Sequence, residues 1–314
     1  MNKMTHQSIA LVDDPLLLPT ASPTGQTSLI SPPVASRPIS QSTSQSLRPK
    51  RMRNSEIPWY HPTISPEHGI LFVLMGSFLT GAALAFDWSS DTTWACMTAF
   101  LGLQAEHPLV VQIKKRRQLQ PRYALWAVLY GSAALGLTVW LSLRHPVLWW
   151  IAGGAIAALA IDIWAVFQRR QKSVTTEIIM FTAICLSTVF IYSATTGTLT
   201  GQALGFWLLN SLFFSSAVYT IKLRKNKTSA LKPGLIYHGV AVLILGGLYG
   251  FGVLSLFSAL TFAIALLKFA FIIWQREWYC NCHFGHVARL ETYFALTYIF
   301  LAALTVLPAR LPVT

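Results

Sequence analysis

The sequence predicts an all-α protein: a polytopic transmembrane helix bundle of about nine helices, with a cytoplasmic N-terminus and an external C-terminus. Three observations predict it. Apolar residues make up 54% of the 314 residues and charged residues only 11%, whereas soluble domains are about 25% charged. Nine apolar stretches fill the chain from about residue 69 to residue 308. The basic residues between them fall almost wholly on alternate loops.

The chain divides into a tail and one membrane body. Residues 1–56 are rich in Ser, Thr, Pro and Gln, as in Ser40–Ser46. Such a segment cannot bury enough apolar surface to offset its ordering entropy, so we expect it to be disordered. Residues 57–314 are then a single membrane-embedded helical domain.

Each apolar stretch is close to the ~20 residues that cross a ~30 Å hydrocarbon core. Helices are expected because lipid cannot satisfy an open strand edge. The boundary between the seventh and eighth stretches rests on four glycines between residues 246 and 252. The expected helices cover residues 69–87, 93–113, 124–142, 146–168, 175–194, 202–221, 234–253, 256–275 and 288–308.

The distribution of charge sets the predicted orientation. Nineteen Lys and Arg residues lie at one set of span ends, and only Arg144 and Arg310 at the other. Basic loops stay in the cytoplasm, so the N-terminus is predicted inside. This explains the net charge of +13 and excludes nucleic acid as a partner. The expected partner is the lipid bilayer, in a bacterial inner or thylakoid-type membrane.

The predicted outer loops contain few polar residues that need an explanation. Asp87 and Asp91 lie close together in the first of them and resemble a paired-carboxylate metal site. A solvated turn is the favoured interpretation of the pair.

The ionisable residues that are expected to be buried in or beside the spans all fall in the predicted cytoplasmic half. Buried charges in a membrane are costly and usually mark a cavity or a partner. Pro108 is expected to kink and interrupt its helix beside two of them. Individually, Glu177 also fits a helix N-terminus, and Lys268 could snorkel to the interface. Together they predict a polar cavity open to the cytoplasm, with these candidate ligand-binding residues: Glu67, His68, Glu106, His107, Asp162, Glu177, His238, Lys268 and Glu291.

A second candidate site is the Cys/His-rich loop at residues 280–286. Cys280, Cys282, His283 and His286 supply thiolate and imidazole, which are suitable zinc ligands. The spacing matches no established zinc motif, so reduced, inert loop residues are the alternative interpretation.

Two motifs carry a family resemblance. Pro66-Glu67-His68-Gly69, together with Glu106-His107-Pro108 before a basic loop, resembles the YwiC-like family of bacterial membrane proteins. Glu177, Tyr219, Tyr237-His238 and Glu291 add to the resemblance. It implies an integral membrane protein without an assigned reaction.

The layout is also similar to that of the UbiA-type membrane prenyltransferases, but their two Asp-rich, Mg²⁺-binding motifs are absent from this sequence. Two functions follow as hypotheses. The first is binding of a small polar or amphipathic ligand in the cytoplasmic cavity, in transport or membrane assembly. The second is an enzyme acting on an isoprenoid or quinone-like substrate, with Glu106, His107 and Asp162 as catalytic groups and Lys222 or Arg224 holding an anionic head.

Overall fold

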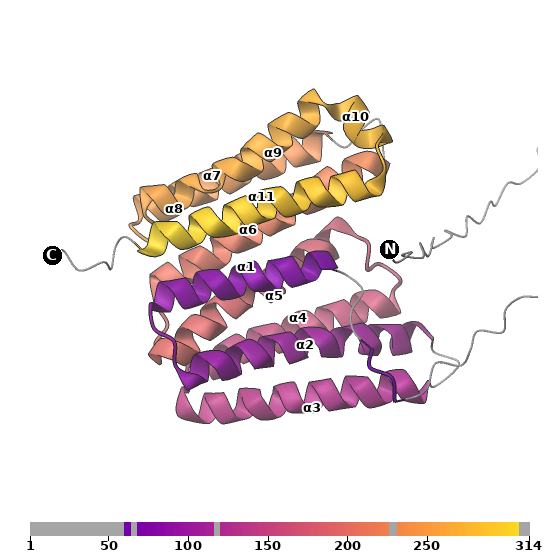
Figure 1. Ribbon diagram of the computed structural model, residues 1–314, viewed down its shortest axis with the longest axis vertical. Helices are drawn as coiled ribbons and strands as arrows, with labels where there is room; N and C mark the ends of the chain where they lie inside the picture. The colour runs from indigo at the N-terminus through magenta and orange to yellow at the C-terminus, as the bar shows by residue number, and fades with distance from the viewer. Residues whose placement is uncertain (1–59, 64–67, 116–119, 226–230, 308–314) are drawn as a thin grey trace, which may run out of the picture. The chain divides into compact units, whose positions relative to one another are not determined.

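The computed structural model describes residues 60–63, 68–115, 120–225 and 231–307. All regular secondary structure in these residues is helical. The predicted tail and Glu67 lie outside the described residues, as does the side chain of His68. Eleven helices follow one another along the chain and pack side by side (Figure 1). They are α1 (His68–Ala85), α2 (Ser90–Lys114), α3 (Pro121–Arg144), α4 (Leu148–Phe167), α5 (Val174–Thr196), α6 (Gly201–Lys225), α7 (Leu231–Gly250), α8 (Leu256–Leu260), α9 (Ala263–Trp274), α10 (Arg276–Asn281) and α11 (Phe284–Val306).

The apolar helices are suited to a membrane. Seven helical segments of the described chain are long and apolar enough to cross one: α3 to α7, the pair α8 and α9 taken as one, and α11. A shorter apolar helix covers Gly69–Ala85. The expected all-helical fold is therefore confirmed over the described residues, and its long apolar helices are compatible with a multi-pass membrane protein.

Two helices differ locally from expectation. Pro108 lies inside α2, and the helix continues through it to Lys114, so the predicted interruption is absent. The span predicted over 256–275 is divided instead, because α8 ends at Leu260 and α9 begins at Ala263.

Side-chain caps set several helix starts. The Ser89 hydroxyl accepts from the backbone N–H of Thr92, and the Thr92 hydroxyl accepts from the backbone N–H of Ser89, which together form a capping box. Ser173 caps α5 in the same position. α5 ends at Thr196, and the C-cap residue Gly197 has a φ of 72°, which favours glycine.

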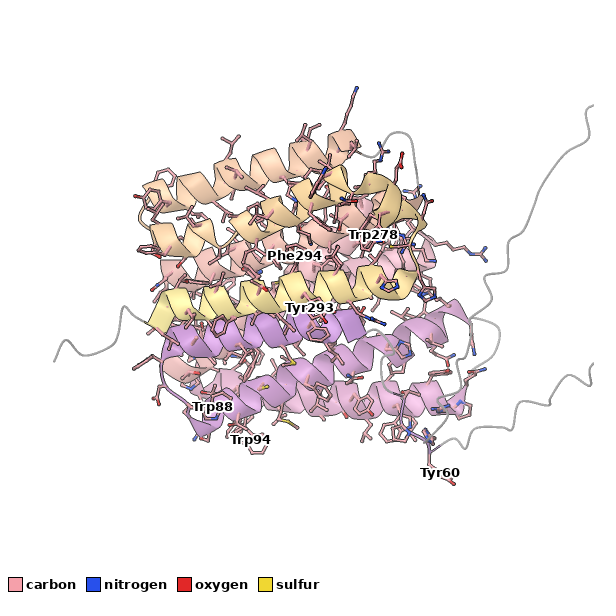
Figure 2. The ribbon with its side chains drawn as sticks, turned by 45° about the horizontal axis from the view of Figure 1, so that its top comes forward. Tyr60, Trp88, Trp94, Trp278, Tyr293 and Phe294 are labelled. Carbon is pink, nitrogen blue, oxygen red and sulfur yellow. The ribbon has the colours of Figure 1, made fainter. Side chains whose placement is uncertain are left out.

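Exposed aromatic residues lie toward both ends of the bundle. Figure 2 shows Trp88 and Trp94 near one end, and Tyr60 and Trp278 toward the other. Tryptophan and tyrosine are enriched at both membrane–water interfaces. Their placement agrees with a bundle whose helix ends lie at the two interfaces.

Tertiary contacts join the loops at each end. At one end, the Arg224 guanidinium donates to the carbonyl of Cys282, Lys222 donates to that of Lys172, and Arg122 donates to that of His61. These residues come from the loops that the sequence predicts to be basic.

At the other end, Asp91 forms an ion pair and a hydrogen bond with the α3–α4 junction. Arg144 Nη1 lies 2.6 Å from one carboxylate oxygen, and His145 Nε2 lies 3.1 Å from the other. The interpretation of Asp91 as part of a solvated turn is therefore wrong. The carboxylate is mostly covered and paired, because the α3–α4 junction folds back onto the start of α2.

A polar network crosses the bundle centre. Tyr298 donates to the amide oxygen of Asn210 at 2.7 Å, and the amide nitrogen of Asn210 donates to Thr80 and Thr188. All four side chains are buried. Every partner comes from a different helix, so the network fixes how α1, α5, α6 and α11 pack.

Candidate ligand cavity in the membrane domain

A cavity of about 320 Å³ lies among the first five helices. Its walls are mainly small and aliphatic side chains, with Gly102 from α2, Gly131 from α3 and Ala155 from α4. Leu74 of α1 and Phe190 of α5 complete the lining. Small residues at facing positions keep the helix backbones close while leaving this hollow between them.

Most polar atoms of the lining are already satisfied. The hydroxyls of Thr98, Thr138 and Ser187 donate to carbonyls of their own helices. Among the described residues that line the cavity, Glu106 is the one ionisable side chain. The cavity is thus an apolar space with a single carboxyl group.

The carboxyl group marks one end of that space. Thr98 and Glu106 both line it from α2, and eight residues of α-helix span about 12 Å. Glu106 lies about 12 Å from Lys114, the last residue of α2, by the same rise per residue. The cavity therefore extends through the middle of the bundle, with its carboxyl group toward the Lys114 end.

The other candidates do not gather around this cavity. Asp162 of α4 is buried, and its Oδ2 has no hydrogen-bond partner among the described residues. Gln171 and the charge of Lys114 lie within range of the carboxyl group. Glu177 pairs with Lys222 at 3.0 Å. His107 follows Glu106 on α2 but is not part of the lining. The physical reason is neutralisation: each of these carboxylates lies near a basic residue of a neighbouring helix, because an isolated buried charge is too costly.

A second polar group forms among α6, α7, α9 and α11. Lys268 Nζ lies 2.9 Å from one oxygen of Glu291, and the Thr220 hydroxyl donates to the other at 2.8 Å. The Lys268 side chain is only 2% exposed. His238 is buried near it, its ring stacked on Phe269 at a centroid distance of 4.2 Å. Three of the predicted residues, His238, Lys268 and Glu291, are therefore brought together.

Sequence reasoning missed two members of this group. Tyr279 of α10 is buried beside Glu291 and Thr220. Burial raises the pKa of its phenol, and the charge of Glu291 raises that pKa further, so the phenol stays protonated. Neither Thr220 nor Tyr279 carries a charge, and nothing in the local sequence distinguishes them from packing residues.

The Cys/His loop forms the α10–α11 junction. The thiol of Cys280 donates to the carbonyl of Leu223 at 3.8 Å, and that of Cys282 to the carbonyl of Tyr279 at 3.6 Å. His283 Nδ1 accepts from the Gly285 N–H and caps α11. Across the described residues, no three His, Cys, Asp or Glu side chains are grouped as metal ligands.

The zinc site, with His286 as one of its ligands, therefore stays a prediction. Metal analysis of the purified protein tests it. We expect about one zinc per chain, lost in Cys282→Ser, because thiolate is the strongest ligand available. Equal metal content in the two proteins would contradict the site.

Residues 64–192 match the family model described as YwiC-like protein. The resemblance drawn from the sequence motifs is confirmed over this stretch. No curated protein and no solved structure matches the chain. All residues that line the cavity, from Leu74 to Phe190, fall inside the matched stretch.

Proposed function

We propose that this YwiC-like membrane protein crosses the bilayer nine times, with its N-terminus inside and its C-terminus outside, and binds a small amphipathic molecule in the cavity of α1–α5. The observation that carries the proposal is the position of Glu106, a carboxyl group at one end of an apolar space. Ligand sites are typically apolar with a few placed polar groups that fix orientation. An apolar body would lie between the small residues, with a polar head at Glu106.

The lining favours a binding role in membrane assembly over transport. A transported polar molecule needs polar partners along its whole path. Toward the other end of this cavity, the hydroxyls of Thr98 and Thr138 are bonded to their own helices. That end of the cavity is a suitable environment for an apolar body, but it has few hydrogen-bonding groups for a polar head.

Filling the cavity tests the binding. A Cβ added at Gly131 has only the Ala105 methyl within 4 Å, at 3.9 Å, so Gly131→Leu places its side chain in the hollow. Gly136→Leu is the matched control, because Gly136 lies on the same helix, has nothing within 4 Å, and does not line the cavity. Lipid extracts of the detergent-purified proteins are compared by mass spectrometry.

We expect a lipid-soluble compound to accompany the wild type and Gly136→Leu at about one per chain, and to be lost from Gly131→Leu. A larger side chain that does not fit its space costs about 1–3 kcal/mol, so thermal melting checks that Gly131→Leu stays folded. An identical set of extracted compounds in all three proteins would refute the binding site.

Reporter fusions test the topology. Fusions at Asn226 and at Thr314 should report the cytoplasm and the exterior respectively, because the first position lies in a basic loop and the second follows the last span. Two fusions on the same side would overturn the nine-crossing arrangement.

The second candidate function is an enzyme acting on a lipid-soluble substrate. The adjacent Glu106 and His107 favour it, since carboxylate and imidazole are the commonest general acid–base groups. Lys222 and Arg224, the candidates for an anionic head, are instead bonded to Glu177 and to the Cys282 carbonyl. Asp162 does not line the cavity.

Lipid profiling of a deletion strain separates the two functions. The strain is complemented with wild type or with Glu106→Gln. A catalytic Glu106 would make one lipid accumulate and another disappear in the variant. A binding role leaves the cellular lipids unchanged and removes the compound that accompanies the purified protein.

A further inference from the structure

The turn between α4 and α5 carries a group of cations. Arg169, Arg170 and Lys172 follow the end of α4 at Phe167, and all three are exposed. None of the ion pairs in the described part of the chain includes any of them. The turn therefore presents three positive charges within four residues, and no described carboxylate pairs with them.

The backbone of Arg169 is in a conformation that arginine rarely adopts. Its φ is 57°, in the left-handed region that favours glycine. The Arg169 N–H donates to the carbonyl of Val166 at 3.1 Å, and the Arg170 N–H donates to that of Ala165 at 2.8 Å. These two bonds form a Schellman motif, in which glycine usually occupies the position of Arg169. The turn after α5 uses Gly197, with a φ of 72°.

An arginine at this position lowers the stability of the turn. In the left-handed region the Cβ lies too close to the following carbonyl oxygen. No hydrogen bond or ion pair of the described residues involves the Arg169 guanidinium, so no contact within the chain offsets this strain. A strained residue with an exposed side chain indicates that the side chain acts on something outside the chain.

Hydrogen bonds hold the backbone of the turn in place. The Arg170 carbonyl accepts from the Ser173 N–H at 3.0 Å and from the Thr176 hydroxyl at 3.4 Å. The Lys172 carbonyl accepts from Lys222 Nζ of α6 at 2.9 Å. The cationic side chains therefore extend from a fixed backbone, which needs no further ordering when they bind an anion.

Apolar side chains lie next to the cations. Trp164 and Phe167, in the last turn of α4, are 66% and 50% exposed. Trp164 precedes Arg169 by five residues, which is about 7.5 Å along a helix axis. Exposed tryptophan beside basic residues is typical of a membrane–water interface. The end of α4 thus presents an apolar surface to lipid chains and, just beyond it, cations to lipid phosphates.

We propose that this turn binds the phosphate of an anionic phospholipid, whose chains lie along Trp164 and Phe167. Arg169 and Arg170 donate to the phosphate oxygens, because the planar guanidinium group binds phosphate bidentately. A zwitterionic lipid fits less well, since its own cation would lie beside three others. A soluble anion would leave the two exposed aromatic rings without a partner. The site requires only that this end of α4 lies at the membrane surface, and it is independent of the cavity of α1–α5.

Site-resolved labelling tests the lipid. Photoactivatable phosphatidylglycerol and phosphatidylcholine with identical chains are incorporated into proteoliposomes of the full chain, and the labelled peptides are mapped by mass spectrometry. At low ionic strength, phosphatidylglycerol should label the peptide that contains Trp164 and Phe167 about tenfold more than phosphatidylcholine does. High salt should reduce this preference, because it screens exposed charges.

Arg169→Gly separates lipid binding from a structural role. Glycine relieves the left-handed strain, so the melting temperature should rise by about 2 °C, while the preference for phosphatidylglycerol should fall about fivefold. Arg169→Lys keeps both the charge and the strain, and should keep most of the preference. Arg289→Gln is the matched control, because Arg289 is an exposed cation near the start of α11. Its loss should leave the labelling of α4 unchanged.

Each of four results would overturn the site. Equal labelling by the two lipids, or an unchanged preference in Arg169→Gly, would mean that the cations are simply solvated. A lower melting temperature of Arg169→Gly would mean that the arginine stabilises the turn itself. An equal loss of preference in Arg289→Gln would mean that the whole basic end attracts lipid without a site. Suppression by inorganic phosphate, but not by chloride at the same ionic strength, would assign the turn to a soluble anion.

Discussion

The two halves of the described membrane domain use buried carboxylates in different ways. In α1–α5, Glu106 lies at the end of an apolar hollow. In α6–α11, Glu291 lies in contact with Lys268 and Thr220, so both of its oxygens are occupied. The family match covers the hollow and ends before the ion pair, at residue 192. Glu106 borders a space that can admit a molecule, whereas Glu291 lies in a closed group of side chains.

The difference has an energetic basis. A buried ion pair offsets its desolvation only when further hydrogen bonds complete it. Glu291 meets that condition, and the ring of Phe213 adds a face 5.6 Å from Lys268 Nζ. We therefore expect the stability of α6–α11 to depend on single charges, and that of α1–α5 to depend on the room left between its helices.

The largest effect is expected from Lys268→Met. It leaves the Glu291 carboxylate in a low-dielectric interior without its cation, which costs about 3–5 kcal/mol when one partner of a buried pair is removed. Thermal unfolding in detergent measures the loss. The double variant Lys268→Met, Glu291→Gln should recover most of it, because an amide can keep the Thr220 hydrogen bond without a charge.

A melting temperature for Lys268→Met equal to that of the wild type would remove the contrast between the halves. The compound expected to accompany the protein should still bind to whatever fraction remains folded, since the ion pair lies outside the cavity lining.

A smaller effect is expected where α1 meets α5. A Cβ on Gly81 would lie 2.5 Å from the carbonyl oxygen of Thr188. Backbone must shift to admit it, so Gly81→Ala should destabilise by about 1–3 kcal/mol. Gly102→Ala is the control in the same half, because its Cβ meets nothing within 4 Å and points to the hollow. Equal melting temperatures for the two variants would show that α1 and α5 are not closely packed.

Much of the fold could be predicted from the sequence, because span length and hydropathy are local properties. The boundary between α7 and α8 illustrates this: glycines between residues 246 and 252 end one helix, and Ser255 caps the next. The division of the following span into α8 and α9 could not be predicted, since Thr261 and Phe262 carry no local break signal.

The site was harder to predict, because depth along a helix says nothing about direction around it. Glu106 and Asp162 both fall in the predicted cytoplasmic half, yet Glu106 lines the cavity and Asp162 lies near Lys114 and Gln171. The ion pair of Lys268 with Glu291 joins residues 23 apart, which only the tertiary fold brings together. The apolar lining was missed because its small residues also fit simple helix packing.

The smallest effect is expected at the end of the bundle that holds Asp91. Asp91→Asn removes the charge that meets Arg144 and His145 and the first-turn carboxylate of α2. Arg144 is half exposed, so the pair is screened, and the two contributions together amount to about 1 kcal/mol. Asp87→Asn is the control, because Asp87 is exposed before the helix begins. A loss of several kcal/mol would instead mean that the pair is as essential as the one between Lys268 and Glu291.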